Sequence, residues 1–253
     1  MANKINTIAE LVVSVFSANG VKRIFGVPGG GSSLDIMEAA AAVGIDFVLT
    51  RSENSAVMMA AATAELDGVP CVALTTKGPG VANAANGIAY AALDRASVIL
   101  LTDGFTAEQE SYITHQVFDQ RALLDPLVKG FLHIHNDTSA SEILALIELA
   151  VTPPLGPIQI ELTGKVAKSE AVTDDLTISA VSAPVTIDNA GVSSAAEAMK
   201  NAVRPVVIVG LEARDDTTAG AVNEFIEALN CPVLSTYKAK GVVADSHSQF
   251  AGI

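Results

Sequence analysis

The sequence has no tryptophan, only two cysteines and few basic residues. Its 15 lysines and arginines stand against 28 aspartates and glutamates, which gives a formal net charge of -13. Surfaces that bind nucleic acids or anionic membranes need clustered Lys and Arg, so this balance argues against both kinds of partner. Cys71 and Cys231 each lie beside a proline in an apolar run. Because two such cysteines make neither a disulfide framework nor a zinc site, we expect both to be small core residues.

Long apolar runs are missing as well. No stretch reaches the roughly 20 residues that a membrane-spanning helix needs, and no apolar stretch near the N-terminus ends in a cleavage-like site. The N-terminal region instead contains Thr7-Ile8-Ala9-Glu10, a capping-box pattern that predicts the start of an amphipathic helix. Half of the 253 residues are hydrophobic, which is enough to bury a core. We therefore expect a folded, cytoplasmic protein that does not contact a membrane.

Short β-branched runs alternate with Ala- and Leu-rich helical patterns through residues 1–165. This alternation is typical of βαβ units, and continuous apolar strands are expected when helices cover both faces of a parallel sheet. The fold class predicted is therefore α/β, a doubly wound parallel sheet with helices on both faces. The predicted strands lie at Arg23 to Val27, Asp46 to Thr50, Val69 to Thr75, Ser97 to Thr102 and Ile158 to Leu162. The predicted helices lie at Thr7 to Ala18, Leu34 to Val43, Glu53 to Leu66, Val81 to Leu93 and Ser139 to Val151.

A change of composition marks the end of this first domain. Residues 166–189 are rich in Thr, Ser, Ala and Asp, which predicts a linker. The βαβ pattern then restarts in residues 190–253. Because two parallel strands do not make an independent domain, we expect an incomplete second α/β unit, completed by another chain or by further sequence. Its predicted elements are helices at Val192 to Ala202 and Thr217 to Leu229, and strands at Pro205 to Gly210 and Pro232 to Thr236.

One carboxylate and one glycine-rich turn stand out as candidates for a site. Glu53 opens an Ala- and Met-rich helix, and Thr76-Lys77-Gly78-Pro79-Gly80 follows one helix and one strand later. A carboxylate in apolar surroundings beside a bare backbone loop suits a flat heteroaromatic cofactor. Taken singly, each feature also fits a glutamate in a first helical turn or an ordinary strand-to-helix turn. Pro28-Gly29-Gly30-Gly31 matches neither G-x-G-x-x-G nor G-x-x-x-x-G-K, so a Rossmann or P-loop site is not predicted.

Several segments occur in an order that is specific when taken together. They are Phe25-Gly26-Val27-Pro28-Gly29-Gly30, Arg51-Ser52-Glu53-Asn54-Ser55-Ala56, Thr76-Lys77-Gly78-Pro79-Gly80-Val81-Ala82-Asn83, Gly87-Ile88-Ala89-Tyr90-Ala91, His115-Gln116-Val117-Phe118-Asp119-Gln120, Gly156-Pro157-Ile158-Gln159-Ile160-Glu161 and Ser235-Thr236-Tyr237-Lys238-Ala239-Lys240-Gly241. This order resembles the pyrimidine-binding domain and the start of the central domain of thiamine-diphosphate enzymes, close to the acetolactate synthase branch. The resemblance covers nearly the whole chain and implies the thiamine-diphosphate-binding fold.

The resemblance implies a role for each candidate residue. Glu53 would be catalytic, because its carboxyl group would hydrogen-bond to the ring nitrogen of the cofactor's aminopyrimidine and activate the cofactor. Substrate would contact Gly30, His115 and Gln116. The residues expected to bind thiamine diphosphate are Pro28, Gly29, Thr76, Gly78, Pro79 and Asn83.

The resemblance also places part of the chemistry outside this chain. In the family a C-terminal domain binds the diphosphate through Mg²⁺, using a Gly-Asp-Gly segment and a downstream Asn. Nothing here resembles that segment, so no metal ligand is predicted within the chain, and Mg²⁺ ligands are expected elsewhere. Acetolactate synthases carry FAD in the central domain, and whether FAD binds here stays open. The family's active site lies between subunits, which implies a homodimer or homotetramer. Because the diphosphate-binding domain is not part of this chain, the resemblance also implies that the chain by itself is inactive.

The expected function is that of an N-terminal portion of a thiamine-diphosphate-dependent carboligase or decarboxylase acting on a small 2-oxo acid. The alternative is a non-catalytic binding or regulatory chain that retains the fold. Ser52 stands where a histidine is usual, and Ala61-Ala62-Thr63 where Asp-Gly-Tyr is typical, so the reaction and the 2-oxo acid stay open. His115 replaces a phenylalanine and is either a donor to a substrate carboxylate or a solvated loop histidine. Lys129 is either the counterpart of a family lysine or a surface charge.

Overall fold

The computed structural model describes residues 5–172, 178–181 and 187–253. Its contacts divide the chain into two compact units, Met1–Pro184 and Val185–Ile253, and this division falls inside the predicted linker. Residues 173–177 and 182–186 of that linker lie outside the described residues. Each unit is described here by itself.

The first unit is built on a six-stranded sheet in which all pairings are parallel, as predicted. The strand order is β2-β1-β3-β4-β6-β5. The strands are β1 (Arg23–Val27), β2 (Asp46–Leu49), β3 (Cys71–Thr75), β4 (Val98–Gly104), β5 (Phe131–His133) and β6 (Ile158–Thr163). The helices are α1 (Ile8–Ala18), α2 (Ser32–Ala42), α3 (Glu53–Asp67), α4 (Pro79–Leu93), α5 (Ala107–Glu110), α6 (Gln120–Leu124), α7 (Ala140–Val151) and α8 (Gly164–Ala167).

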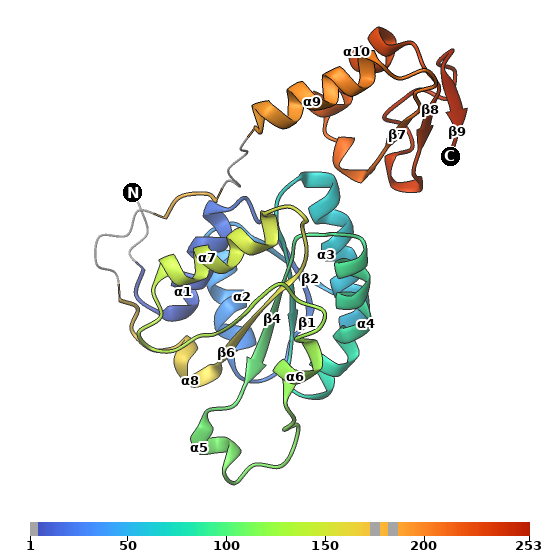
Figure 1. Cartoon of the computed structure of the whole chain (residues 1–253). Helices are drawn as coiled ribbons and strands as arrows, with labels where there is room; N and C mark the ends of the chain where they lie inside the picture. Colours follow the sequence, from blue (N-terminus) through green and yellow to red (C-terminus); the bar gives the residue numbers. More distant parts are fainter. Residues whose placement is uncertain (1–4, 173–177, 182–186) are drawn as a thin grey trace. The chain divides into compact units, whose positions relative to one another are not determined.

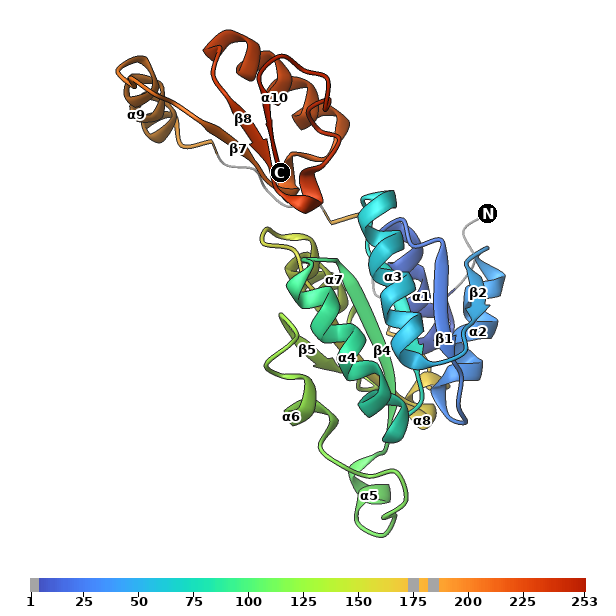
Figure 2. The same ribbon diagram turned by 90° about the vertical axis from the view of Figure 1, so that its right-hand side faces the viewer.

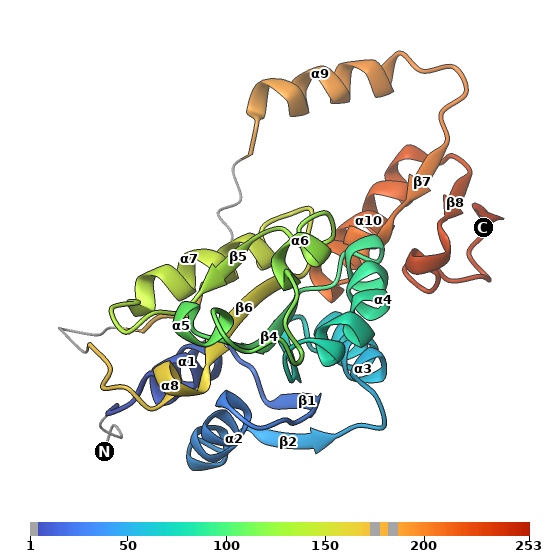
Figure 3. The same cartoon turned by 90° about the horizontal axis from the view of Figure 1, so that it is seen from below.

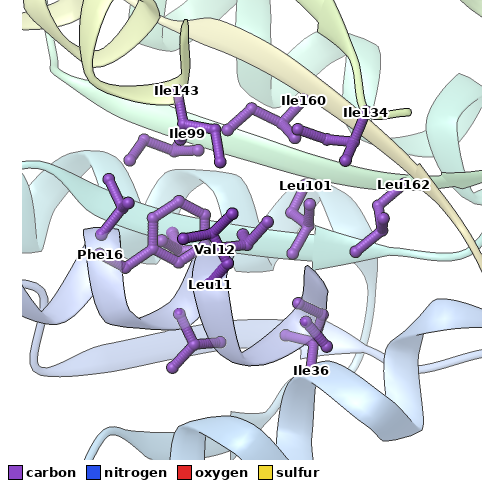
Figure 4. Packing of buried hydrophobic residues seen from close by; sticks show 14 of the residues in the cluster. Leu11, Val12, Phe16, Ile36, Ile99, Leu101, Ile134, Ile143, Ile160 and Leu162 are labelled. Carbon is purple, nitrogen blue, oxygen red and sulfur yellow. The ribbon is translucent and has the colours of Figure 1, made fainter. Parts of the chain in front are cut away.

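Helices cover both faces of this sheet, so the doubly wound architecture is confirmed (Figures 1 and 3). One buried cluster joins α1, α2, α7 and α8 to the sheet, and a second joins α3, α4 and α6 to the opposite face. Figure 4 shows side chains of α1 and α2 gathered with those of β4, β6 and α7 in the first cluster. Leu11, Val12 and Phe16 of α1 are fully buried there. The continuous apolar strands of the sequence therefore follow from burial on both sides.

The capping box predicted for the first helix is present. The backbone N–H of Glu10 donates to Thr7 Oγ1 at 3.2 Å, and the backbone N–H of Thr7 donates to Glu10 Oε2 at 3.2 Å. These bonds satisfy amide groups that the first helical turn leaves without intrahelical partners. α1 thus begins at Ile8, next to the capping residue that the sequence indicates.

The second unit contains a three-stranded parallel sheet in the order β7-β8-β9. The prediction of only two strands was wrong, because Phe250–Gly252 forms β9 against β8. β7 and β8 lie in apolar runs that indicate a strand, whereas β9 follows the polar residues 246–249 and so has no such run. A small core forms around Val209, Ile226 and Val233. The elements are α9 (Asn189–Lys200), β7 (Val207–Val209), η1 (Leu211–Ala213), α10 (Asp216–Leu229), β8 (Val233–Ser235), η2 (Tyr237–Ala239) and β9 (Phe250–Gly252).

Both cysteines are buried, as expected for small core residues. Burial raises the pKa of the Cys71 thiol to about 12, which makes its thiolate form scarce at neutral pH. None of the helices that the structure describes has the length and hydrophobicity required for a membrane crossing.

Candidate active site

The carboxyl ends of β1 and β3 form a topological switch point. From β1 the chain crosses to β2 on one side, whereas from β3 it crosses to β4 on the other. The helices that follow these strands, α2 and α4, pack on opposite faces of the sheet. In open α/β sheets such a divergence leaves a crevice at the carboxyl edge, where ligands bind. The predicted site residues Pro28, Gly29 and Gly30 directly follow β1 at this edge, and Thr76, Gly78 and Pro79 follow β3.

Glu53 lies at the first position of α3, beside the start of α4. Asn83 Nδ2 donates a hydrogen bond to Glu53 Oε2, so two residues predicted for the cofactor site are brought together. Gly80 packs against the same carboxylate, since a Cβ atom at residue 80 would lie 3.3 Å from Glu53 Oε1. Ser52, in the place of the usual histidine, caps α3 by accepting a hydrogen bond from the Ser55 N–H at 3.3 Å. The site therefore presents a half-buried carboxylate beside Gly80, a residue without a side chain.

The two glycine-rich turns touch across the switch point. A Cβ atom at Gly29 would lie only 2.1 Å from Thr76 Oγ1, so a side chain at residue 29 would require the turns to separate. Gly78 has a φ of +64°, in the left-handed region that favours glycine, and its N–H donates to Gln120 Oε1 at 3.4 Å. Gln120 thereby ties the turn before α4 to α6.

A pocket of about 460 Å³ opens beside these turns. Predicted residues from three separate segments line it. Of these, His115 and Gln116 belong to the segment between α5 and α6. That segment extends beyond the carboxyl end of β4 in Figures 1 and 2. Pro28, Glu53 and Asn83 do not line this pocket, nor do Gly78 and Pro79. The lining residues are Gly29, Gly30, Thr76, Lys77, Phe105, Ile113, His115 and Gln116.

Gln116 has an unusual backbone conformation in this pocket. Its φ of +65° lies in the left-handed region, which costs free energy for a residue with a Cβ atom. Its carbonyl oxygen also approaches Gly78 so closely that a Cβ atom there would lie 2.4 Å away. Gln116 is therefore held against the turn that precedes α4. Such strained residues cluster at functional sites.

A buried polar network below the pocket was missed by the sequence analysis. Asp103, at the end of β4, is 1% exposed and forms an ion pair with Lys77. Gln120 Nε2 donates to the Asp103 carbonyl at 3.2 Å and to Glu161 Oε2 at 3.1 Å. The available signal was a set of polar residues at the carboxyl ends of apolar strands, Asp103 on β4 and Glu161 on β6. The network links the ends of β3, β4 and β6 to α6.

His133 extends this network at the edge strand β5. Its Nδ1 lies 2.7 Å from Glu161 Oε1. The pKa of His133 is raised above its ordinary value of 6.5, mainly by this hydrogen bond and further by the charges of Glu161 and Glu110, while burial opposes the shift. The folded unit therefore binds a proton at His133 more tightly than the unfolded chain does.

Because the pKa of His133 is higher in the folded state, its protonation stabilises the fold fully below pH 6.5. That contribution is lost as the pH rises through the raised pKa of the folded state. We expect the free energy of unfolding to fall as the pH increases above 6.5, and His133→Gln to remove this part of the fall. Urea unfolding at a series of pH values measures the effect. Parallel pH profiles for the two proteins would contradict the assignment.

Two family descriptions match this chain. The family described as "Thiamine pyrophosphate enzyme, N-terminal TPP binding domain" matches residues 6–123, and the "central domain" of the same enzymes matches residues 192–253. The chain belongs to the thiamine pyrophosphate enzyme family. The resemblance to this family inferred from the sequence motifs is thus confirmed.

Curated members of the family include acetolactate synthases. The chain is 32% identical to "Acetolactate synthase isozyme 3 large subunit" of Escherichia coli (strain K12), over 97% of the chain and 44% of the relative. It is 29% identical to "Acetolactate synthase" of Bacillus subtilis (strain 168), over 98% of the chain and 44% of the relative. The chain thus spans less than half the length of these relatives. It corresponds to the N-terminal region of acetolactate synthase-like thiamine pyrophosphate enzymes.

Solved structures of this family share the fold. A thiamin diphosphate-dependent enzyme from Mycobacterium smegmatis aligns with a TM-score of 0.86 and 22% identity, over 98% of this chain and 48% of the other. The "thiamine diphosphate-dependent 4-hydroxybenzoylformate decarboxylase" of Rhodococcus jostii RHA1 aligns with a TM-score of 0.86 and 19% identity, over 98% of this chain and 47% of the other. At these identities the likeness concerns the fold.

The residues at the switch point fit the pyrimidine part of thiamine diphosphate. The absence of a side chain at Gly80 leaves Glu53 Oε1 next to bare backbone, while Asn83 engages Glu53 Oε2. A flat ring with a nitrogen acceptor and an amino group can pair with such a carboxyl group and such backbone. Within residues 5–172, 178–181 and 187–253, no group of three or more His, Cys, Asp or Glu side chains is arranged to hold a metal ion.

Proposed function

We propose that the chain is the N-terminal portion of a thiamine-diphosphate-dependent carboligase or decarboxylase acting on a 2-oxo acid. The observation that carries the proposal is the position of Glu53 at the switch point, hydrogen-bonded to Asn83 and packed against Gly80. When bound, thiamine diphosphate supplies the electron sink that lets a 2-oxo acid lose CO₂ or join a second carbonyl compound. In this proposal residues 1–165 form the pyrimidine-binding domain, residues 166–189 a linker, and residues 190–253 the first part of the central domain.

Each residue of the site has a role in this proposal. Glu53 Oε1 holds the proton that is shared with the ring nitrogen of the cofactor. Asn83 fixes the carboxyl group through Oε2. Ser52 caps α3 and so holds the backbone of Glu53 in place. The residues proposed to contact the cofactor through their backbone or short side chains are Pro28, Gly29, Thr76, Gly78 and Pro79.

The roles above do not include the diphosphate of the cofactor, the partner subunit or the substrate. We propose that Mg²⁺ binds the diphosphate through oxygen ligands beyond this chain, and that the active site is completed in a homodimer or homotetramer. Gly30, His115 and Gln116 form the substrate side of the site, because His115 and Gln116 reach the pocket beside Gly30.

The assembled enzyme that contains this chain should bind thiamine diphosphate in a Mg²⁺-dependent manner and consume a 2-oxo acid. Calorimetric titration with the cofactor, with Mg²⁺ and with EDTA, measures the first property. A panel of 2-oxo acids, followed by CO₂ release and by product analysis, measures the second. Cofactor binding without consumption of any 2-oxo acid would instead favour a non-catalytic chain that retains the fold.

A further inference from the structure

Lys77 is the only lysine or arginine among the residues that line the described pocket. It follows β3 at the switch point, and its side chain is 12% exposed. The ammonium group forms an ion pair with Asp103 and lies 4.7 Å from the centre of the Phe105 ring. A lysine held by both a carboxylate and an aromatic face has lost most of the freedom of its four-carbon chain. Its position is therefore fixed before any ligand arrives.

Asp103 uses both of its oxygens within the protein. Oδ1 accepts hydrogen bonds from the N–H and the Oγ of Ser32, each at 3.3 Å, and Oδ2 accepts from Lys77. Since its side chain is 1% exposed, Asp103 faces protein rather than the pocket. An ammonium group has three N–H donors, and one of them serves Asp103. Lys77 can thus offer further donors to a ligand in the pocket that it lines.

The lining of the pocket differs in charge from the rest of the chain. It contains one lysine and one histidine and no acidic residue, although acidic residues outnumber basic ones by 28 to 15 in the whole sequence. Because the Lys77–Asp103 pair is neutral overall, the pocket recognises a ligand through directed N–H donors rather than through net charge. Carboxylates suit such donors, since charge-assisted hydrogen bonds are short and strong. An aliphatic group in the same place would leave the ammonium donors without partners.

The proposed reaction determines which carboxylate of a substrate Lys77 can bind without slowing the reaction. A carboxylate that departs as CO₂ loses its charge on the way to the transition state. An ion pair with it would therefore stabilise the ground state more than the transition state, and so slow the reaction. A carboxylate that is retained through the reaction carries no such penalty. Lys77 therefore fits a second carboxylate, separate from the 2-oxo acid group. A pocket of about 460 Å³ is large enough for such a ligand.

We propose that Lys77, positioned by Asp103 and Phe105, makes this site selective for a 2-oxo dicarboxylic acid over a 2-oxo acid with an aliphatic tail. This inference rests on the proposed function for the reaction type and deepens it by naming the class of substrate. The competing explanation is that the Lys77–Asp103 pair only joins the turn after β3 to the end of β4. A purely structural pair would affect all ligands alike, whereas a specificity residue changes the ratio of their affinities.

The test compares 2-oxoglutarate with 2-oxopentanoate, which has the same five-carbon chain without the distal carboxylate. Binding of each to the 253-residue chain is followed by NMR titration. We expect 2-oxoglutarate to bind roughly tenfold to a hundredfold more tightly, the range expected for a hydrogen bond to a charged group. Lys77→Met should bring this ratio close to one. Lys165→Met, at an exposed lysine of α8, is the matched control and should keep the ratio of the wild type.

Three outcomes would overturn the inference. They are equal affinity of the wild type for both acids, no binding of either acid, and a Lys77→Met variant that weakens both acids by the same factor. The last outcome would identify the pair as a structural link. Failure of the proposed function would give another result. The chain would still bind 2-oxoglutarate selectively, but the assembled enzyme would consume no 2-oxo acid.

Discussion

Replacing Glu53 by glutamine should slow 2-oxo acid turnover by the assembled enzyme by roughly two to four orders of magnitude. Glutamine has nearly the same shape and can still accept a hydrogen bond from Asn83, so the fold and the contact between α3 and α4 should persist. It cannot share a proton with the cofactor ring in the way that a carboxyl group does. Hydrogen–deuterium exchange at the thiazolium carbon of the bound cofactor, followed by NMR, measures this step without the rest of the turnover.

The matched control for this experiment is Glu148→Gln. Glu148 is an exposed residue of α7, on the opposite face of the sheet from α3 and α4, and its substitution should leave the exchange rate unchanged. A Glu53→Gln protein that binds the cofactor and exchanges at the rate of the wild type would remove Glu53 from the mechanism.

Leu11→Ala should lower the free energy of unfolding of the first unit by about 3–5 kcal/mol, as is found for large-to-small changes that leave a cavity. Leu11 is fully buried in the cluster formed by α1, α2, α7 and the sheet (Figure 4). Neighbours from several elements surround it, and we expect them to close the cavity only in part. Hydrogen exchange of peptides from residues 5–172, with mass spectrometry, reports on this unit separately from the second.

Leu93→Ala makes the same chemical change at the end of α4, where the leucine is 85% exposed. Its effect on the free energy of unfolding should stay within about 0.5 kcal/mol, because no packed neighbours are lost. Equal destabilisation by both substitutions would show that the cluster around Leu11 does not support the stability of the first unit.

The longer elements could be predicted from the sequence because burial leaves a continuous pattern. β3 and β4 are buried along their whole length, and the predicted strands overlap both. β5 and α6 could not be predicted in this way. β5 has three half-buried residues and ends in a histidine, and α6 has five residues, so neither provides a full hydrophobic period. Their positions depend on contacts with β6 and α4 rather than on local preference.

The candidate site was predictable where its residues are neighbours in a motif. Gly29, Gly30, Thr76, His115 and Gln116 were selected from three motifs, and the structure brings them to one pocket. The pair of Lys77 with Asp103 could not be foreseen in this way, because the two residues are 26 positions apart and meet only when β3 and β4 pair. Each of them alone looks like an ordinary charged residue at a loop. Contacts between residues on different strands therefore follow from the fold and not from any one motif.

The place of β6 between β4 and β5 sets an order of events during synthesis of the protein. β4 pairs with β6 from Ile99 opposite Ile158 to Gly104 opposite Thr163, although β5 leaves the ribosome earlier. The amide and carbonyl groups on that side of β4 thus have no strand partner until β6 emerges. Because an open apolar strand edge is a template for association with other chains, we expect the nascent protein to be prone to aggregation in this interval. We expect a chaperone that shields nascent chains to reduce aggregation in this interval.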